Sequence, residues 1–194
     1  ILKILVTGGL GFIGSHTVVE LQNAGYEVVV IDDLSNASVE VLDGIEAITG
    51  KKPEFEKLDL RDRNAVSAFF KKYADVSGAI HFAASKAVGE SVHKPLLYYE
   101  NNLSSLVYLL KELTEKASAN FIFSSSCTVY GQADELPITE NAPVKPAESP
   151  YGNTKQIGEE IIRDTAKVYE NFNAIALRYF NPIGAHESVE IGEL

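Results

Sequence analysis

The feature that most constrains the fold of this chain is a glycine-rich turn between a strand pattern and a helix pattern. The turn reads Gly8-Gly9-Leu10-Gly11-Phe12-Ile13-Gly14. It follows the apolar run Ile4–Val6, typical of a buried parallel strand, and precedes residues 15–24, whose apolar residues recur at helical spacing. Glycines let the backbone approach a pyrophosphate, and the free N–H groups of a new helix attract phosphates. The order predicts a dinucleotide-binding unit, with a tight turn that binds nothing as the alternative.

The rest of the chain alternates strand patterns with amphipathic helix patterns. Six strands with intervening helices predict an α/β fold with a doubly wound parallel sheet (a Rossmann fold), three α/β/α layers and the strand order 3-2-1-4-5-6. Ligands of such sheets bind beyond the carboxyl ends of the strands, so we expect the site at that edge. Beyond the first unit, strands are predicted over 27–31, 54–58, 77–82, 120–124 and 174–180, and helices over 38–49, 62–73, 95–117 and 150–170.

Composition excludes several classes of function. The net charge of −10 argues against a nucleic-acid partner. A single cysteine, Cys127, leaves no intramolecular disulfide and no cysteine metal cluster, and the four histidines are scattered, so no metal site is expected. No apolar run approaches the ~20 residues of a membrane span, and no signal-peptide pattern opens the chain. A cytoplasmic protein is therefore the expectation.

Asp32 is the candidate residue for determining specificity between NAD and NADP. It ends the second predicted strand, about 20 residues beyond the glycine turn, where a carboxylate accepts hydrogen bonds from the adenosine ribose. A carboxylate there would repel a 2′-phosphate, and no arginine adjoins Asp32 in the sequence to offset this. NAD is therefore predicted rather than NADP. A solvated aspartate at a strand end is the alternative interpretation.

A Y-x-x-x-K pattern, Tyr151 to Lys155, opens the last predicted helix. Residues four apart share a helix face, and a nearby ammonium together with a positively charged nicotinamide lowers the pKa of a tyrosine from its usual value of about 10. Tyr151 is therefore a candidate base, and Lys155 can also bind the cofactor ribose. The serines 124–126 end the fifth predicted strand, where a hydroxyl can hold a substrate oxygen. Otherwise the pattern marks an ordinary surface helix, and the serines bond their own backbone.

Three motifs together resemble the extended short-chain dehydrogenase/reductases: T-G-G-x-G-F-I-G-S-H, Y-x-x-x-K and R-Y-F-N-P-I-G-A-H. K-A-V-G-E-S at 86–91 and F-I-F-S-S-S-C-T-V-Y-G at 121–131 narrow this resemblance to the UDP-glucose 4-epimerase family, across the whole chain. The resemblance implies a reversible, NAD-dependent inversion at C4 of a UDP-hexose (UDP-glucose/UDP-galactose) through a 4-keto intermediate. Its catalytic trio falls on Ser126, Tyr151 and Lys155.

The resemblance also implies contacts to the cofactor and the nucleotide sugar. Those to the substrate fall on Lys86, Ser126, Tyr151 and Asn181. Those to NAD fall on Gly8, Gly11, Phe12, Ile13, Gly14, Asp32, Asp33, Leu34, Ser35, Asn36, Ala37, Asp59, Leu60, Phe82, Ala83, Ala84, Ser85, Lys86, Asn101, Ser124, Tyr151, Lys155 and Phe180.

Members of that family are much longer, and their sugar- and uridine-binding residues lie largely in a C-terminal domain. We therefore expect residues 1–181 to form the NAD-binding domain and 182–194 to begin the substrate-binding region. The predicted helices 95–117 and 150–170 carry more apolar residues than one sheet contact requires. Their outer faces are predicted to pair in a homodimer, as the resemblance also suggests.

Other functions are compatible with the same fold. Nucleotide-sugar 4,6-dehydratases and decarboxylases share the scaffold. The dehydratases resemble T-D-E at the end of the fifth strand, because elimination of water needs a further acid and base. Here Ser126-Cys127-Thr128 stands at that place, which favours an epimerase. A non-catalytic NAD-binding domain or regulator is another possibility, but such regulators typically lack Y-x-x-x-K.

Overall fold

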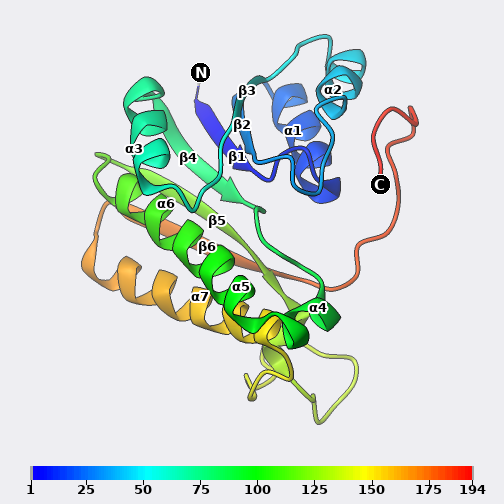
Figure 1. The fold of residues 1–194 in the computed structure, drawn as a ribbon, viewed down its shortest axis with the longest axis vertical. Helices are drawn as coiled ribbons and strands as arrows, with labels where there is room; N and C mark the ends of the chain where they lie inside the picture. The colour runs from blue at the N-terminus through cyan, green and yellow to red at the C-terminus, as the bar shows by residue number, and fades with distance from the viewer. Residues whose placement is uncertain (1, 194) are drawn as a thin grey trace.

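One parallel sheet organises the computed structural model, which describes residues 2–193. Ile1 and Leu194, the ends of the two expected domain ranges, lie outside the described residues. The strand order is β3-β2-β1-β4-β5-β6 (Figure 1), so the predicted order 3-2-1-4-5-6 is confirmed. The strands are β1 (Lys3–Thr7), β2 (Glu27–Asp32), β3 (Glu54–Lys57), β4 (Val76–His81), β5 (Ala119–Ser126) and β6 (Phe172–Tyr179).

Helices cover both faces of the sheet. Helices α1 and α2 lie on one face, and α3, α6 and α7 on the other, the arrangement of a doubly wound fold (Figure 1). Each face has its own apolar core, one packed under α1 and α2 and one under α3, α6 and α7. The helical segments are α1 (Phe12–Asn23), α2 (Val41–Thr49), α3 (Arg63–Lys72), α4 (Val88–His93), α5 (Pro95–Tyr99), η1 (Glu100–Ser104), α6 (Ser105–Thr114), η2 (Cys127–Tyr130) and α7 (Pro150–Val168).

Local sequence signals explain where two of these helices begin. The Asp62 side chain accepts hydrogen bonds from the backbone N–H groups of Asn64 and Ala65, which caps α3. Ser149 caps α7 through the backbone N–H of Gly152, and Pro150 occupies the first turn. The start of α7 places the Y-x-x-x-K pattern in its first two turns, directly beside the end of β5.

The predicted helix 95–117 differs from the structure in two ways. It is interrupted by η1, a π-helical turn between α5 and α6, and it is preceded by the short helix α4, which the sequence pattern did not indicate. The Ser105 hydroxyl bonds the carbonyl of Asn101 at this turn. A π turn adds a residue to the helix repeat and occurs often at functional sites. Here it presents the side chains of Asn101 and Asn102 to the loop that follows β4.

His81 ends β4 as a buried, neutral histidine. Its Nδ1 lies 2.7 Å from Oγ1 of Thr7, and its ring packs against Phe121 and Phe123. Burial, with a smaller contribution from the positive charge of Lys155, lowers the pKa of His81 to about 3. The imidazole is therefore held uncharged in the folded protein.

This burial predicts a specific loss of stability in acid. An unfolded histidine titrates near 6.5, so between that value and about 3 the unfolded chain binds a proton that the folded chain refuses. The free energy of unfolding should therefore fall as pH drops through this range. In a His81→Gln variant, whose amide can still bond Thr7, urea midpoints measured from pH 7 to pH 4 should decline less steeply. Parallel declines would contradict this account of His81.

Candidate active site

The glycines of the turn allow backbone segments to pack more closely than any side chain would permit. Gly8 has a φ of +65°, and a Cβ there would lie 2.7 Å from the backbone nitrogen of Ala83. A Cβ on Gly14 would lie 2.2 Å from the carbonyl oxygen of Gly8. Gly11 precedes α1 with no side-chain cap, and the first turn of α1 carries no acidic residue. The turn thus offers backbone N–H groups and a positive helix end, which fit a pyrophosphate.

Asp32 lies at the end of β2, directly beside this turn. Its Oδ2 accepts a hydrogen bond of 3.2 Å from the backbone N–H of Leu10, and its Oδ1 one of 3.0 Å from Leu34. Burial raises the pKa of Asp32, and these two backbone bonds oppose the rise. Leu34 has a φ of 62°, a conformation that a leucine rarely adopts. A carboxylate accepts about four hydrogen bonds, so each oxygen keeps capacity for a ribose hydroxyl.

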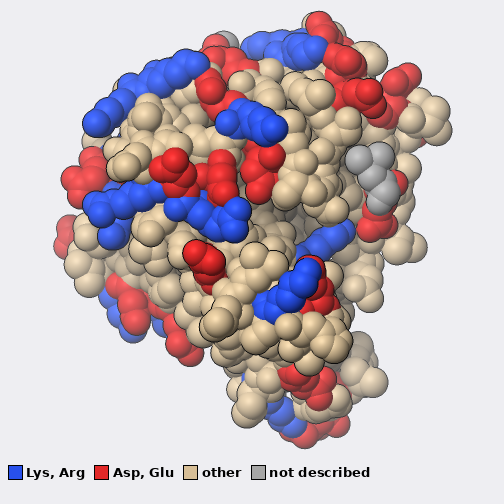
Figure 2. All heavy atoms as spheres, viewed as in Figure 1, with Lys and Arg blue, Asp and Glu red and all other residues tan. Residues whose placement is uncertain are grey.

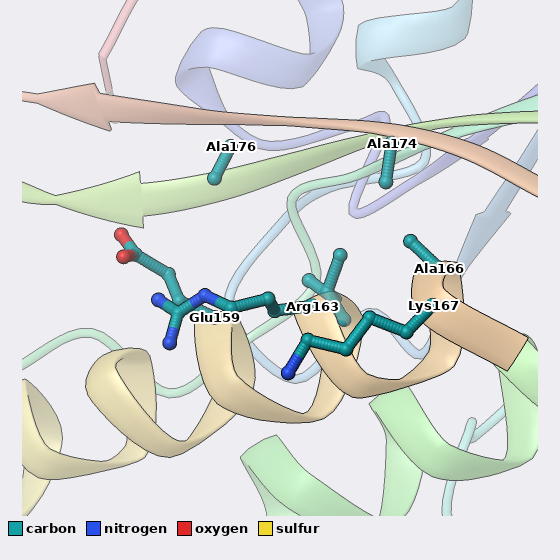
Figure 3. A pocket seen from close by; sticks show the side chains of 7 residues that line it. Glu159, Arg163, Ala166, Lys167, Ala174 and Ala176 are labelled. Atoms are coloured by element: carbon teal, nitrogen blue, oxygen red, sulfur yellow. The ribbon is translucent and has the colours of Figure 1, made fainter.

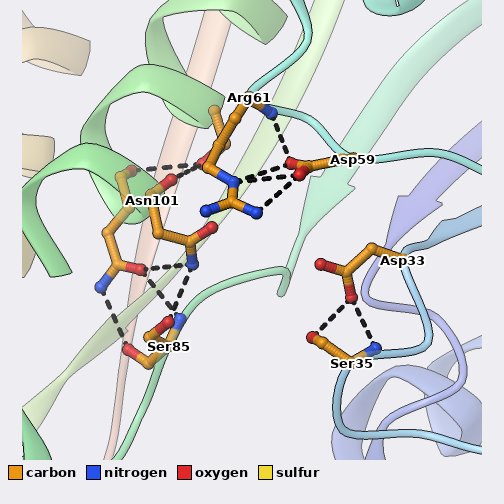
Figure 4. Close-up of polar contacts among 8 residues, drawn as sticks. Asp33, Ser35, Asp59, Arg61, Ser85 and Asn101 are labelled. Atoms are coloured by element: carbon orange, nitrogen blue, oxygen red, sulfur yellow. Dashed lines mark hydrogen bonds and ion pairs between the residues drawn. The ribbon is translucent and has the colours of Figure 1, made fainter. Parts of the chain in front are cut away.

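An arginine that sequence analysis did not single out reaches the same end of the site. Arg61 donates to the Asp59 carboxylate through Nε at 3.0 Å and Nη2 at 2.7 Å (Figure 4). This pairing lowers the pKa of Asp59. Asp33, which lies across from the pair in Figure 4, is engaged with the backbone and hydroxyl of Ser35. The positive charge of Arg61, which lies near Asp33, is therefore already neutralised by Asp59.

The loop after β4 is held by the π turn. The backbone N–H of Ser85 donates to Oδ1 of Asn102 at 2.8 Å, and Asn101 donates to the Ser85 hydroxyl at 3.0 Å (Figure 4). Asn102, which sequence analysis missed, is buried and also bonds the hydroxyl of Thr154 on α7 at 3.1 Å. Lys86, predicted to contact cofactor and substrate, has an exposed side chain, and its Nζ lies 3.7 Å from the Glu193 carboxylate.

The structure brings the expected trio together at the end of β5. Lys155 is 4% exposed, and its ammonium donates to the carbonyl of Ser124 at 2.7 Å. The same Nζ lies 5.7 Å from the centroid of the Tyr151 ring. The Tyr151 hydroxyl is within hydrogen-bonding reach of Ser126. Tyr151 and Lys155 lie in successive turns of α7, so both side chains face this strand end.

Burial dominates the pKa of Tyr151 in the chain by itself. Burial raises it above its usual value, while the hydrogen bond with Ser126 acts in the opposite direction. The expectation that the Lys155 ammonium and a bound nicotinamide together lower this pKa concerns the complex with NAD and stays a prediction. Burial also lowers the pKa of Lys155 to about 8. We expect a positively charged group bound beside Tyr151 to favour its phenolate form and so to oppose the effect of burial.

The remaining predicted site residues also follow strand ends, so the whole set lies along the carboxyl edge of the sheet. Phe180 and Asn181 follow β6 and are exposed. The ring centroids of the neighbouring Tyr179 and of Phe82 are 6.4 Å apart, so the ends of β6 and β4 lie close together. Gly8, Gly11, Phe12, Ile13 and Gly14 follow β1; Asp32, Asp33, Leu34, Ser35, Asn36 and Ala37 end or follow β2; Asp59 and Leu60 follow β3; and Phe82, Ala83, Ala84, Ser85 and Lys86 follow β4.

The surface charge of the molecule adds little to the description of the site. Acidic and basic side chains are interspersed on the face shown in Figure 2. Within residues 2–193, no group of three His, Cys, Asp or Glu side chains is arranged to hold a metal ion. Among the helices of the same residues, none has both the length and the apolar character needed to cross a membrane.

A doubly wound sheet with a glycine turn, a strand-end aspartate and a Ser–Tyr–Lys group defines a dinucleotide-binding domain of the short-chain dehydrogenase/reductase class. Comparison with known families makes this specific. Residues 4–191 match the NAD dependent epimerase/dehydratase family, and the chain belongs to that family.

Individual relatives agree with this assignment. The chain is 50% identical to the UDP-glucose 4-epimerase of Haemophilus influenzae over 192 residues, 99% of this chain and 56% of the relative. It is also 50% identical to the UDP-glucose 4-epimerase of Bacillus subtilis, with the same coverage. The crystal structure of UDP-glucose 4-epimerase from Bifidobacterium longum in complex with NAD⁺ and UDP superposes with a TM-score of 0.95 at 46% identity, covering 98% of this chain and 57% of that one. The chain thus spans little more than half the length of these relatives.

Proposed function

We propose that this chain is the cofactor-binding portion of an NAD-dependent epimerase that inverts C4 of a UDP-hexose, interconverting UDP-glucose and UDP-galactose through a 4-keto sugar. The observation that carries the proposal is the convergence of Ser126, Tyr151 and Lys155 at the edge that also holds the glycine turn. Relatives at 50% identity named as UDP-glucose 4-epimerases support the same reaction.

Each residue of the trio has a distinct role in this proposal. Bound NAD supplies the acceptor and donor of the hydride at C4. Tyr151 takes the proton of the 4-hydroxyl and later returns it to the oxygen. Ser126, within hydrogen-bonding reach of the Tyr151 hydroxyl, orients that sugar oxygen. Lys155 stabilises the Tyr151 phenolate and bonds the cofactor ribose, with its ammonium fixed by the carbonyl of Ser124.

The end of β5 supports an epimerase over a dehydratase. Cys127 and Thr128 follow Ser126 in the short helix η2, so residues 126–128 contain no carboxyl group. Elimination of water from the sugar needs an acid and a base beyond those that move the hydride. Neither Cys127 nor Thr128 is a carboxylic acid that could supply this chemistry.

We also infer the domain division from the uncovered part of the sheet. Residues 1–181 form the NAD-binding domain, and 182–194 begin the substrate-binding region. Ile175 and Leu177 on β6 are 60% and 40% exposed, as expected of a strand that further chain would cover. Ile191 is buried in the apolar core beneath α1 and α2, so the final residues already pack on this domain.

A direct assay tests the proposed reaction. The full-length protein, incubated with UDP-galactose and no added reductant, should form UDP-glucose until both sugars reach equilibrium. UDP-N-acetylglucosamine, tested in parallel, distinguishes a broader substrate range. Formation of a dehydrated 4-keto-6-deoxy sugar instead would identify a dehydratase.

Cofactor choice is predicted to depend on Asp32. Loss of hydrogen bonds to a charged group weakens an interaction by about 1.5–3 kcal/mol, so Asp32→Asn in full-length protein should bind NAD roughly 10- to 100-fold more weakly. Isothermal titration calorimetry with NAD and NADP measures this. Asp43→Asn, on the exposed side of α2, is the matched control. Equal affinity of the unaltered protein for NAD and NADP would contradict the assigned role.

We also propose that the full-length protein forms a homodimer. Leu96 and Leu97 on α5 are 81% and 37% exposed, and Tyr99 of α5 accepts a hydrogen bond from Asn153 of α7. These two helices therefore lie together and can present one surface to a second copy, forming a four-helix bundle. Light scattering of the full-length protein should give twice the monomer mass at micromolar concentration. A stable monomer would refute the dimer.

A further inference from the structure

A buried carboxylate lies one turn beyond Lys155 on α7. Glu159 is 9% exposed and accepts a hydrogen bond of 2.5 Å from the hydroxyl of Ser125. The Arg178 guanidinium donates to the same carboxylate at both ends, Nε to Oε1 at 2.9 Å and Nη2 to Oε2 at 2.7 Å. Burial raises the pKa of Glu159, but the bonds from Arg178 and Ser125 outweigh it, so the group stays ionised.

This carboxylate joins three elements of the fold. Ser125 and Arg178 are register partners on the neighbouring strands β5 and β6, and Glu159 reaches both from α7. Figure 3 shows its side chain directed from the helix toward the sheet, at the border of an open hollow between α7 and β6. Arg178 also lies over the ring of Tyr130, 4.7 Å from the centroid, and so holds the segment that follows Ser126.

The three serines that end β5 each have a partner on α7. Lys155 bonds the carbonyl of Ser124, Glu159 bonds the hydroxyl of Ser125, and Tyr151 is within reach of Ser126. The helix is also pressed against the strand, because a Cβ on Gly158 would lie 2.8 Å from the ring of Phe123. A shift of α7 along β5 would therefore break the bonds to Ser124 and Ser125 and move Tyr151 relative to Ser126.

We propose that Glu159, bound to Ser125 and Arg178, is a positioning residue that sets the distance between Ser126 on β5 and the Tyr151–Lys155 pair on α7. The inference rests on the proposed function, because its consequence is measured in the epimerase reaction. None of these three residues touches the trio's reacting groups in the proposed mechanism. They act by fixing the helix on the strand.

Two variants of the full-length enzyme test the role. Glu159→Gln keeps the shape but removes the charge that holds Arg178, and Ser125→Ala removes only the bond to β5. Because misplacement of reacting groups by about 1 Å can lower a rate 10²-fold, kcat should fall about 10- to 100-fold while KM stays within a few-fold. Glu160→Gln, the exposed neighbour on α7, is the control and should retain full activity.

A pH profile separates positioning from a general loss of structure. The Ser126 hydroxyl, within reach of Tyr151, lowers the pKa of Tyr151, so moving the two groups apart should shift the rising limb of kcat to higher pH in both variants. Should Glu159→Gln fail to fold, Ser125→Ala carries the same test, since it keeps the Glu159–Arg178 pair. If the unaltered enzyme is active and both variants keep its kcat and its pH profile, the role of Glu159 is overturned and the proposed function is not. Inactive unaltered enzyme overturns the proposed function, and this inference with it.

Discussion

Replacement of Tyr151 by phenylalanine in the full-length enzyme is expected to lower the rate of epimerisation by at least about 10²-fold, the usual contribution of a positioned acid–base group. The substitution removes the hydroxyl that lies within reach of Ser126 and leaves the aromatic ring, which is 5.7 Å from the ammonium of Lys155. The glycine turn and Asp32 are unchanged, so NAD should remain bound.

The measurement combines turnover of UDP-galactose with calorimetric titration of NAD. Tyr169→Phe, at the exposed end of the same helix, is a matched control that loses a hydroxyl far from β5 and should keep full activity. A Tyr151→Phe enzyme with a rate near normal would show that another group removes the proton. Loss of NAD binding together with activity would instead mean that the Tyr151 hydroxyl is needed to hold the cofactor.

Sequence patterns were sufficient for the topology because the strands carry strong signals. β-Branched runs such as Val28–Ile31, together with the right-handed crossover rule, leave few ways to order six parallel strands. The sequence did not reveal α4 or the π turn η1. A helix of six residues, Val88–His93, is too short to show a helical period, and a π turn differs from an α-helix by a single added residue.

Site residues could be predicted where a local sequence pattern marks them. They could not be predicted where their hydrogen-bond partners come from distant parts of the chain. Tyr151 and Lys155 share a local pattern, so their common face was predictable. The bonds of Glu159 to Ser125 and Arg178 span 34 and 19 residues and exist only once α7 packs on the sheet.

The effect of burial on a pKa is equally hard to predict from the sequence. The raised pKa of Tyr151 results mainly from desolvation, which depends on what packs around the ring. The position of the Lys155 ammonium on the same helix face follows from the sequence, but its effect on the pKa of Tyr151 cannot be weighed there against the loss of water. The charge of Lys155 is therefore best tested by removing it.

Lys155→Met in the full-length enzyme is expected to slow turnover at neutral pH and to move the rising limb of the pH–rate profile upward, on the order of one to two pKa units. The methionine fills the space of the lysine stem but removes the ammonium, which lies 5.7 Å from the Tyr151 ring centroid and favours the phenolate. Without it Tyr151 stays protonated to higher pH, where it cannot act as a base. Because burial lowers the pKa of Lys155 to about 8, the variant should also lack a titration near that value.

The profile of kcat against pH, compared with that of the exposed control Lys167→Met on the same helix, measures both effects. A lower kcat with an unmoved profile would reduce Lys155 to a ligand of the cofactor ribose. The pKa of Tyr151 would then depend on the positive charge of the nicotinamide alone, since the hydrogen bond with Ser126 does not by itself offset the effect of burial. An upward shift of the profile, in contrast, requires that the buried ammonium acts on the phenolate directly, with its position set by the carbonyl of Ser124.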